Sequence, residues 1–200
     1  MAKIFKRVVL YSFLLLLFCA GIPQIVAAQA MRTETLQFDQ DNPFSVKISI
    51  PSGWWATRER GTPIPGIPQT YDIKLMPPSG IKTAVTISIG RNQHSTPFTQ
   101  QQFDSLVTTR VSSLLRYAVE KNPRYNEVEL QGGYGRYCTL TDASLANRTN
   151  NIPNDEYLFL TFYFANYENG FTINAVVLAD DVNSAFFQLI LRSLSSIEVN

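Results

Sequence analysis

The chain has 200 residues, of which 45% are hydrophobic, 12% aromatic and 16% charged. This composition is typical of a folded domain and excludes a disordered chain. The 17 lysine and arginine residues nearly balance the 16 aspartate and glutamate residues, which leaves a net charge of +1. Such a balance excludes a polycationic nucleic-acid-binding protein and an acidic tail.

The first thirty residues have the pattern of an export signal. Three basic residues precede an apolar run at residues 8–18, and Ala-Gln-Ala at residues 28–30 supplies a small-residue cleavage pattern. We therefore predict a signal peptide over residues 1–30, cleavage after Ala30, and export to the periplasm or the extracellular space. The alternative is an uncleaved anchor, because residues 8–28 are just long enough to span a bilayer.

One cysteine, Cys138, follows the predicted cleavage point, so the mature chain has no internal disulfide. Cys138 alternates in phase with Leu140, which predicts a small buried hydrophobic residue. A reactive thiol is the alternative.

Alternation predicts several strands in the first half of the chain. Residues 44–50 alternate strictly between apolar and polar types, and residues 34–38 are expected to be their partner strand. Pro51 and Gly53 end this strand before two tryptophans. Residues 57–68 contain too many prolines for a helix and are predicted to be an exposed loop. Residues 71–75 and 83–89 are predicted to form a hairpin.

A helix is predicted to begin at Thr99, because Gln102 completes a capping box and apolar residues then recur at helical spacing until Asn122. Strands are expected at residues 127–130, 134–141, 156–165 and 171–179. A run at residues 158–164 is apolar on both faces, which predicts a central strand covered on both sides. A final helix is expected to begin near Asp181 or Asn183 and to bury Phe186, Phe187, Ile190, Leu191 and Leu194.

This order of elements lacks the regular strand–helix alternation of a parallel sheet. The expected fold class is therefore α+β. We expect one antiparallel β-sheet of about six to seven strands flanked by two helices, an α/β/α sandwich that forms a single domain over residues 31–200.

The arrangement resembles the PsbP-like and DcrB-like superfamily of small exported α+β domains. The resemblance rests on Ile-Ser-Ile-Pro-Ser-Gly-Trp at residues 48–54, Phe-Thr-Gln-Gln-Gln-Phe at 98–103, the aromatic strand before Asn-Gly, and the closing helix. It implies a non-enzymatic role in assisting other components of the cell envelope or a membrane. Some members bind metal through histidines, but this chain has only His94, so that property is not carried over.

No arrangement of residues predicts catalysis. His94 is the only histidine and is expected in a solvated loop, so no base is available to a nucleophile. His94 and Cys138 cannot complete a zinc site. The adjacent Asp180 and Asp181 are interpreted as helix-capping residues. We therefore predict no catalytic residue, no metal and no cofactor.

The candidate binding residues are Trp55, Arg58 and Arg60, because tryptophan and arginine are enriched at binding hot spots. We expect an exported, non-catalytic accessory or binding protein that acts through contacts with an envelope or membrane-associated protein. The first alternative is a carrier of an apolar or amphipathic small molecule between sheet and helix, suggested by the aromatic residues at 159–164. A carboxylate-dependent hydrolase is the third hypothesis. No nucleic-acid partner is expected.

Overall fold

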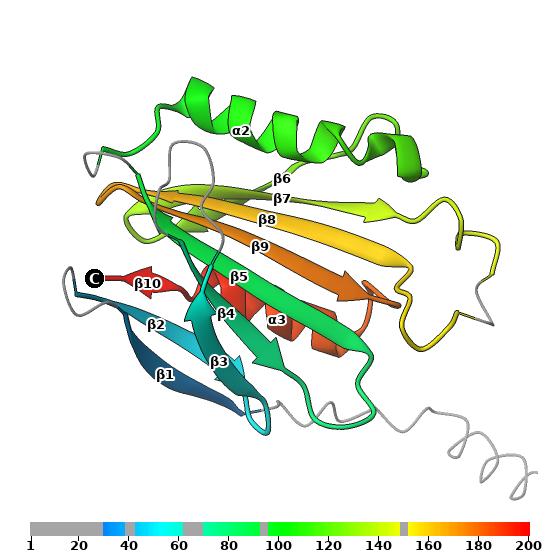
Figure 1. Cartoon of the computed structure of the whole chain (residues 1–200), viewed down its shortest axis with the longest axis horizontal. Helices are drawn as coiled ribbons and strands as arrows, with labels where there is room; N and C mark the ends of the chain where they lie inside the picture. The colour runs from blue at the N-terminus through cyan, green and yellow to red at the C-terminus, as the bar shows by residue number, and fades with distance from the viewer. Residues whose placement is uncertain (1–29, 39–42, 62–69, 93–95, 149–151) are drawn as a thin grey trace, which may run out of the picture. The chain divides into compact units, whose positions relative to one another are not determined.

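The computed structural model describes residues 30–38, 43–61, 70–92, 96–148 and 152–200. Apart from Ala30, the predicted export signal lies outside these residues, as do His94 and most of the proline-rich segment. Residues Met31–Asn200 form one compact unit. In this unit the described residues form two antiparallel sheets and two α-helices (Figure 1). The expected antiparallel α+β architecture is therefore confirmed.

The larger sheet has seven strands in the order β3-β4-β5-β9-β8-β7-β6, and the smaller sheet has three in the order β1-β2-β10. The elements are β1 (Met31–Phe38), β2 (Phe44–Pro51), β3 (Trp55–Arg60), β4 (Thr70–Met76), β5 (Thr83–Arg91), α2 (Gln100–Ser112), the 3-10 helix η2 (Leu115–Tyr117), β6 (Asn126–Leu130), β7 (Gly133–Thr141), β8 (Phe159–Tyr167), β9 (Phe171–Ala179), α3 (Ala185–Ser195) and β10 (Glu198–Val199).

The hairpin of β1 and β2 forms as predicted, but it belongs to a second sheet that the sequence did not predict. Val46, Ile48 and Ile50 are buried on one side of β2, as their alternation requires. The two residues of β10 pair with the same strand, so that Glu198 lies opposite Lys47. Together with α3, the smaller sheet covers one face of the larger one. The expectation of one sheet flanked only by helices was therefore wrong.

The aromatic strand β8 lies inside the seven-stranded sheet, and both of its faces are covered. Tyr163 and Ala165 belong to the core cluster beneath α3 and β2. Phe162 and Phe164 point the other way and join a second cluster with Phe103 of α2. The predicted two-sided covering of this strand is confirmed.

Helix α2 begins at the predicted cap. The side chain of Thr99 accepts a hydrogen bond from the backbone N–H of Gln102, and the Gln102 side chain accepts one from the backbone N–H of Thr99. The helix ends at Ser112, well before the predicted end at Asn122. Ser112 donates its hydroxyl hydrogen to the Thr109 carbonyl, a local bond that competes with continued helix.

The chain after α2 is fixed to the end of β7. The Val119 N–H donates to the Thr141 carbonyl. Both carboxylate oxygens of Glu120 accept hydrogen bonds of 2.7 Å from Thr141, one from its N–H and one from its hydroxyl. Burial alone would raise the pKa of Glu120, but these hydrogen bonds outweigh it and hold the pKa below its usual value. Residues 119–120, which were predicted to be helical, are therefore held by hydrogen bonds to the last residue of β7.

The final helix is capped by Ser184, whose side chain accepts from the Phe187 N–H, and not by Asp181 or Asn183. Phe187, Ile190 and Leu194 are buried as predicted, with Leu191 partly buried. Phe186 is 37% exposed, so its predicted burial was wrong.

A buried asparagine holds the segment before α2 against the sheet. Asn166 of β8 accepts a hydrogen bond from the Phe98 N–H at 3.2 Å and donates to the Phe98 carbonyl at 3.0 Å. Its amide also donates to the Tyr134 hydroxyl at 3.1 Å. Asn166 thus satisfies both backbone groups of a residue next to the helix cap, which fixes where α2 starts above the sheet.

Candidate functional site: an uncovered half of the sheet

Of the two adjacent indoles, Trp54 is in the core and Trp55 is on the surface. Trp54 is 1% exposed, whereas Trp55 is 48% exposed at the beginning of β3. The cross-strand partner of Trp55 is Met76, which is 40% exposed. These two side chains form an exposed apolar pair, since directly opposed residues of antiparallel strands lie on the same face.

Arg58 and Arg60 do not share that face. Residues 55–60 form an edge strand, and side chains alternate along it. The predicted loop at 57–68 was therefore wrong for residues 57–60, and residues 62–68 lie outside the described residues. Arg58 donates to the Gln37 carbonyl, and its guanidinium carbon lies 6.0 Å from the centre of the Phe38 ring. Arg58 therefore joins the two sheets. The predicted trio of Trp55, Arg58 and Arg60 is not brought together as one binding surface.

A larger surface becomes visible when the two faces of the seven-stranded sheet are compared. On β4, β5 and β9, most side chains that face α3 and β2 are buried, such as Ile73, Ile87 and Ala175. Most side chains that face the other way are half-buried or exposed, although Thr70 and Thr172 at one end are buried. Helix α2 runs beside β6, β7 and β8 in Figure 1, and the cluster beneath it reaches as far as Val176 of β9. No other described helix lies on this face of β4 and β5. We call this surface the uncovered face; it consists of Trp55, Thr57, Glu59, Asp72, Lys74, Met76, Ala84, Thr86, Ser88, Asn174, Val176 and Leu178.

The register sets these residues in rows across the sheet. One row runs from Thr57 through Lys74 and Thr86 to Val176. The ammonium group of Lys74 forms an ion pair with Glu59, and this hydrogen bond raises the pKa of Lys74. The paired charges leave the middle of the uncovered face nearly neutral.

The two ends of the uncovered face differ in chemistry. The Oδ1 atoms of Asp72 and Asn174 are buried and accept no hydrogen bond from described residues, and Ser88 lies between them in register. A Cβ on Gly61 would lie 2.8 Å from Asp72 Oδ1, so Gly61 packs closely against this end of the face. The exposed apolar side chains lie at the opposite end.

Helix α2 forms one side of this surface. Asp104 makes an ion pair of 2.7 Å with Arg136 of β7, which fixes the flank of α2 that faces β7. At 100° per residue, Leu106 lies on the opposite flank, toward β9. Leu106 is partly buried and packs against the cluster that Val176 borders. The uncovered face is therefore bounded by a helix that already packs on the same sheet.

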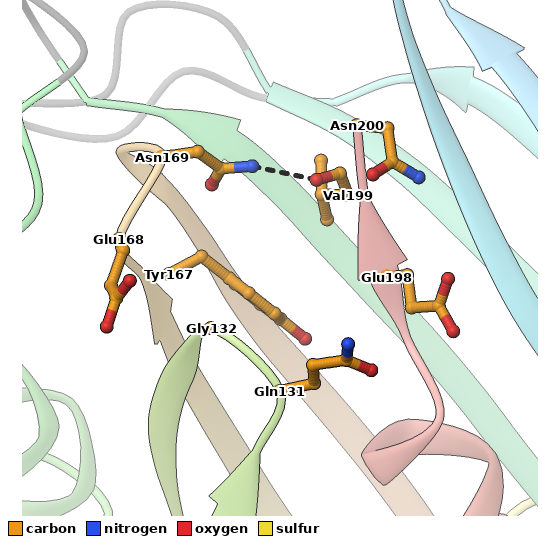
Figure 2. A pocket seen from close by; sticks show the side chains of 8 residues that line it. All are labelled: Gln131, Gly132, Tyr167, Glu168, Asn169, Glu198, Val199 and Asn200. Carbon is orange, nitrogen blue, oxygen red and sulfur yellow. Dashed lines mark hydrogen bonds between the residues drawn. The ribbon is translucent and has the colours of Figure 1, made fainter.

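A separate cavity of about 280 Å³ lies at the far ends of the strands (Figure 2). Its lining residues are Gln131, Gly132, Tyr167, Glu168, Asn169, Glu198, Val199 and Asn200. The carboxylates of Glu168 and Glu198 point away from one another in Figure 2, and Glu198 is already paired with Lys47. The Tyr167 hydroxyl donates to the Ile197 carbonyl at 2.8 Å. The wall of this cavity mixes polar and apolar atoms, and none of residues 159–164, which suggested the carrier hypothesis, lines it.

Three ionisable residues that the sequence analysis considered, Asp180, Asp181 and Cys138, have structural roles. No group of three or more His, Cys, Asp or Glu side chains suited to a metal ion occurs among the described residues. Asp180 makes an ion pair of 2.9 Å with Lys82 and accepts from the Leu158 N–H, while Asp181 accepts from the Asn183 N–H. Burial raises the pKa of the Cys138 thiol to about 11. These roles fix strand ends and fill the core.

The chain was compared with known protein families and with curated proteins, and neither comparison finds a match. In the described residues, no helix has both the length and the apolar character needed to cross a membrane. What the protein does therefore has to follow from its own residues.

Sequence reasoning missed most of the uncovered face. Thr57 was assigned to a loop, and Thr86 was assigned to a strand without a role. The sequence signal for this face is the alternation at residues 83–89, where small or polar residues alternate with valine and isoleucine. This alternation predicts a less apolar face, but it does not say whether a helix covers that face.

Proposed function

We propose that the protein is an exported, non-catalytic binding protein of the PsbP-like and DcrB-like type, and that its uncovered face holds a protein partner of the cell envelope. The signal-like pattern of residues 1–30 supports export. The resemblance stated above supports an accessory role. The structural roles of Asp180, Asp181 and Cys138 support a function without catalysis.

One observation carries the proposal. Strands β5 and β9 are third and fourth in a sheet of seven, yet alternate side chains on one of their faces are only half-buried. On the opposite face the neighbouring residues, such as Ile87 and Ala175, are fully buried. Central strands of a sheet usually have both faces covered when the connections supply enough helices. Among the described residues, one helix covers part of this face, and we propose that another molecule binds the remainder.

The dimensions and chemistry of the uncovered face suit a helix of the partner. Four strands spaced about 4.8 Å apart span about 14 Å between the outer strand axes. A helix with its side chains is about 10 Å wide, and helices pack about 8–10 Å apart. One helix therefore fits beside α2. Trp55 and Met76 provide the apolar anchors, and Thr57 and Thr86 provide a flat polar surface without unpaired charge.

The proposal is tested by photo-crosslinking in intact cells. A photoactivatable amino acid replaces Thr86 on the uncovered face, or Thr108 on the exposed side of α2 as a matched control. We expect an adduct of one defined mass with an envelope protein from position 86 and not from position 108. The additional substitution Thr57→Arg should abolish this adduct. Absence of any adduct from position 86, or the same adducts from both positions, would contradict the proposal.

A further inference from the structure

The exposed large apolar side chains of the described residues lie at one end of the fold, where β1 and β3 begin. The opposite end carries the cavity near Asn200. The exposed set is Met31, Trp55, Met76, Tyr117, Val119 and Phe186.

Contacts along the first strands place three of these residues together. Met31 lies opposite Pro51, and Arg32 donates to the Trp54 carbonyl. The first residue of β1 is therefore close to the first residues of β3. Trp55 is paired with Met76, the last residue of β4. Two sheets thus present apolar side chains at the same end.

The other three residues lie further along that end of the large sheet. Strand pairing joins Thr83, Ala179, Phe159 and Thr141 in one row across β5, β9, β8 and β7. Tyr117 and Val119 flank the end of this row, because the Val119 N–H donates to the Thr141 carbonyl and the Ala143 N–H donates to the Tyr117 carbonyl, both at 2.9 Å. Phe186 lies in the first turn of α3, which follows β9.

The chain also enters the fold at this end. Strand β1 begins at Met31, directly after the thirty residues that contain the apolar run at 8–18. Tryptophan and tyrosine are enriched at membrane–water interfaces, because each has an apolar body and a polar group. The six strands from β3 to β7 are about 24 Å wide. Across this width the exposed side chains are separate anchors and do not form one compact patch.

We propose that this end of the fold rests on the surface of a lipid bilayer. The contact is mainly apolar. Lys82 is neutralised by Asp180 at 2.9 Å, and Lys121 donates to the Leu115 and Ala118 carbonyls. The guanidinium carbon of Arg116 lies 4.6 Å from the centre of the Tyr117 ring, so this cation stacks on one of the anchors. Binding should therefore occur on zwitterionic lipid and change little with salt. The proposal goes beyond the partner-binding function, because it assigns lipid as the ligand of this end of the fold, which shares only Trp55 and Met76 with the uncovered face.

Tryptophan fluorescence tests the proposal directly. The protein is isolated as the cell produces it and mixed with phosphatidylcholine vesicles whose acyl chains carry bromine, which quenches tryptophan at the membrane. Because Trp54 is buried, quenching reports on Trp55. We expect quenching in the native protein and none in Trp55→Phe. A reporter at the opposite end, Glu168→Trp in the Trp55→Phe background, should not be quenched.

A second measurement uses residues outside the uncovered face. The double substitution Tyr117→Ser and Phe186→Ser should lower the vesicle partition coefficient about tenfold, while the far-ultraviolet spectrum stays unchanged. The matched double substitution Thr108→Ser and Ser112→Ala on α2 should leave the partition coefficient unchanged. Absence of vesicle binding, an unquenched Trp55, or equal quenching of the reporter at position 168 would overturn the proposal. None of these results affects crosslinking from position 86, so the two proposals can fail separately.

Discussion

Substitution of Asn166 by alanine tests how the fold holds α2 above the sheet. Asn166 is 1% exposed and makes three hydrogen bonds, two to the backbone of Phe98 and one to the Tyr134 hydroxyl. Each neutral hydrogen bond contributes about 0.5–1.5 kcal/mol, and a buried group left without a partner costs about 1–3 kcal/mol. The Phe98 carbonyl keeps one donor, the Tyr134 hydroxyl at 3.2 Å. Loss of the amide should therefore lower the free energy of unfolding by about 2–4 kcal/mol.

The measurement is urea unfolding followed by tryptophan fluorescence, with Asn169→Ala as the matched control. Asn169 is exposed, and its amide donates to the Val199 carbonyl at 2.7 Å. Its removal should cost less than about 1 kcal/mol. Hydrogen exchange should also become faster in the first turn of α2 in Asn166→Ala alone. If the free energy of unfolding falls by less than about 0.5 kcal/mol, or by the same amount as in the control, Asn166 does not hold α2 against the sheet.

Three further predictions concern ionisable side chains. The pKa of Glu120 lies below its usual value in the folded chain, so its contribution to stability is present at neutral pH and is lost as the pH falls through the lowered pKa. Glu120→Gln should therefore lower the free energy of unfolding at pH 7 and reduce its decrease at acid pH. An unchanged dependence of the free energy of unfolding on pH would contradict this. The buried Cys138 thiol, with its pKa raised to about 11, should react with a thiol reagent only as fast as the protein unfolds; rapid labelling of the folded protein would show the opposite. Burial raises the pKa of both Tyr163 and Tyr167, so stability should fall as the pH rises above about 10, and the double substitution by phenylalanine should reduce this alkaline loss in thermal unfolding scans.

Local patterns predicted the parts of the fold that depend on local physics. The capping box at Thr99 and Gln102 forms because its two hydrogen bonds join residues three apart. The double apolar pattern at residues 158–164 predicted a strand covered on both faces, and β8 has this environment. In these cases one segment contained all the information that the prediction needed.

Features that depend on distant contacts were not predictable in the same way. Strand β10 has two residues and pairs with β2 about 150 positions earlier, so no local pattern marks it. Strand β3 is at a sheet edge and alternates little in burial, because most of its side chains are exposed on either face. The prolines at residues 63–68 therefore decided the loop prediction for residues 57–60 as well. Phe186 is exposed because Phe187, Ile190 and Leu194 form the flank of α3 that packs on the core, and residue 186 points about 100° away from residue 187.

The candidate site shows the same division. Trp55 was selected from residue type and is exposed as expected. Its grouping with Arg58 failed because alternation along β3 places the two side chains on opposite faces. The uncovered face depends on how far one helix extends across seven strands, which is a property of the assembled sheet.

The central claim is that the uncovered face binds a protein partner, and the affinity of the purified pair tests it most directly. Thr86→Arg places a charged side chain in the middle of this face, between Lys74 and Val176, and Thr108→Arg places the same side chain on the exposed side of α2. The account predicts at least a tenfold increase in the dissociation constant for Thr86→Arg, about 1.4 kcal/mol, and no change for Thr108→Arg. Equal affinity for the native protein and Thr86→Arg would contradict it.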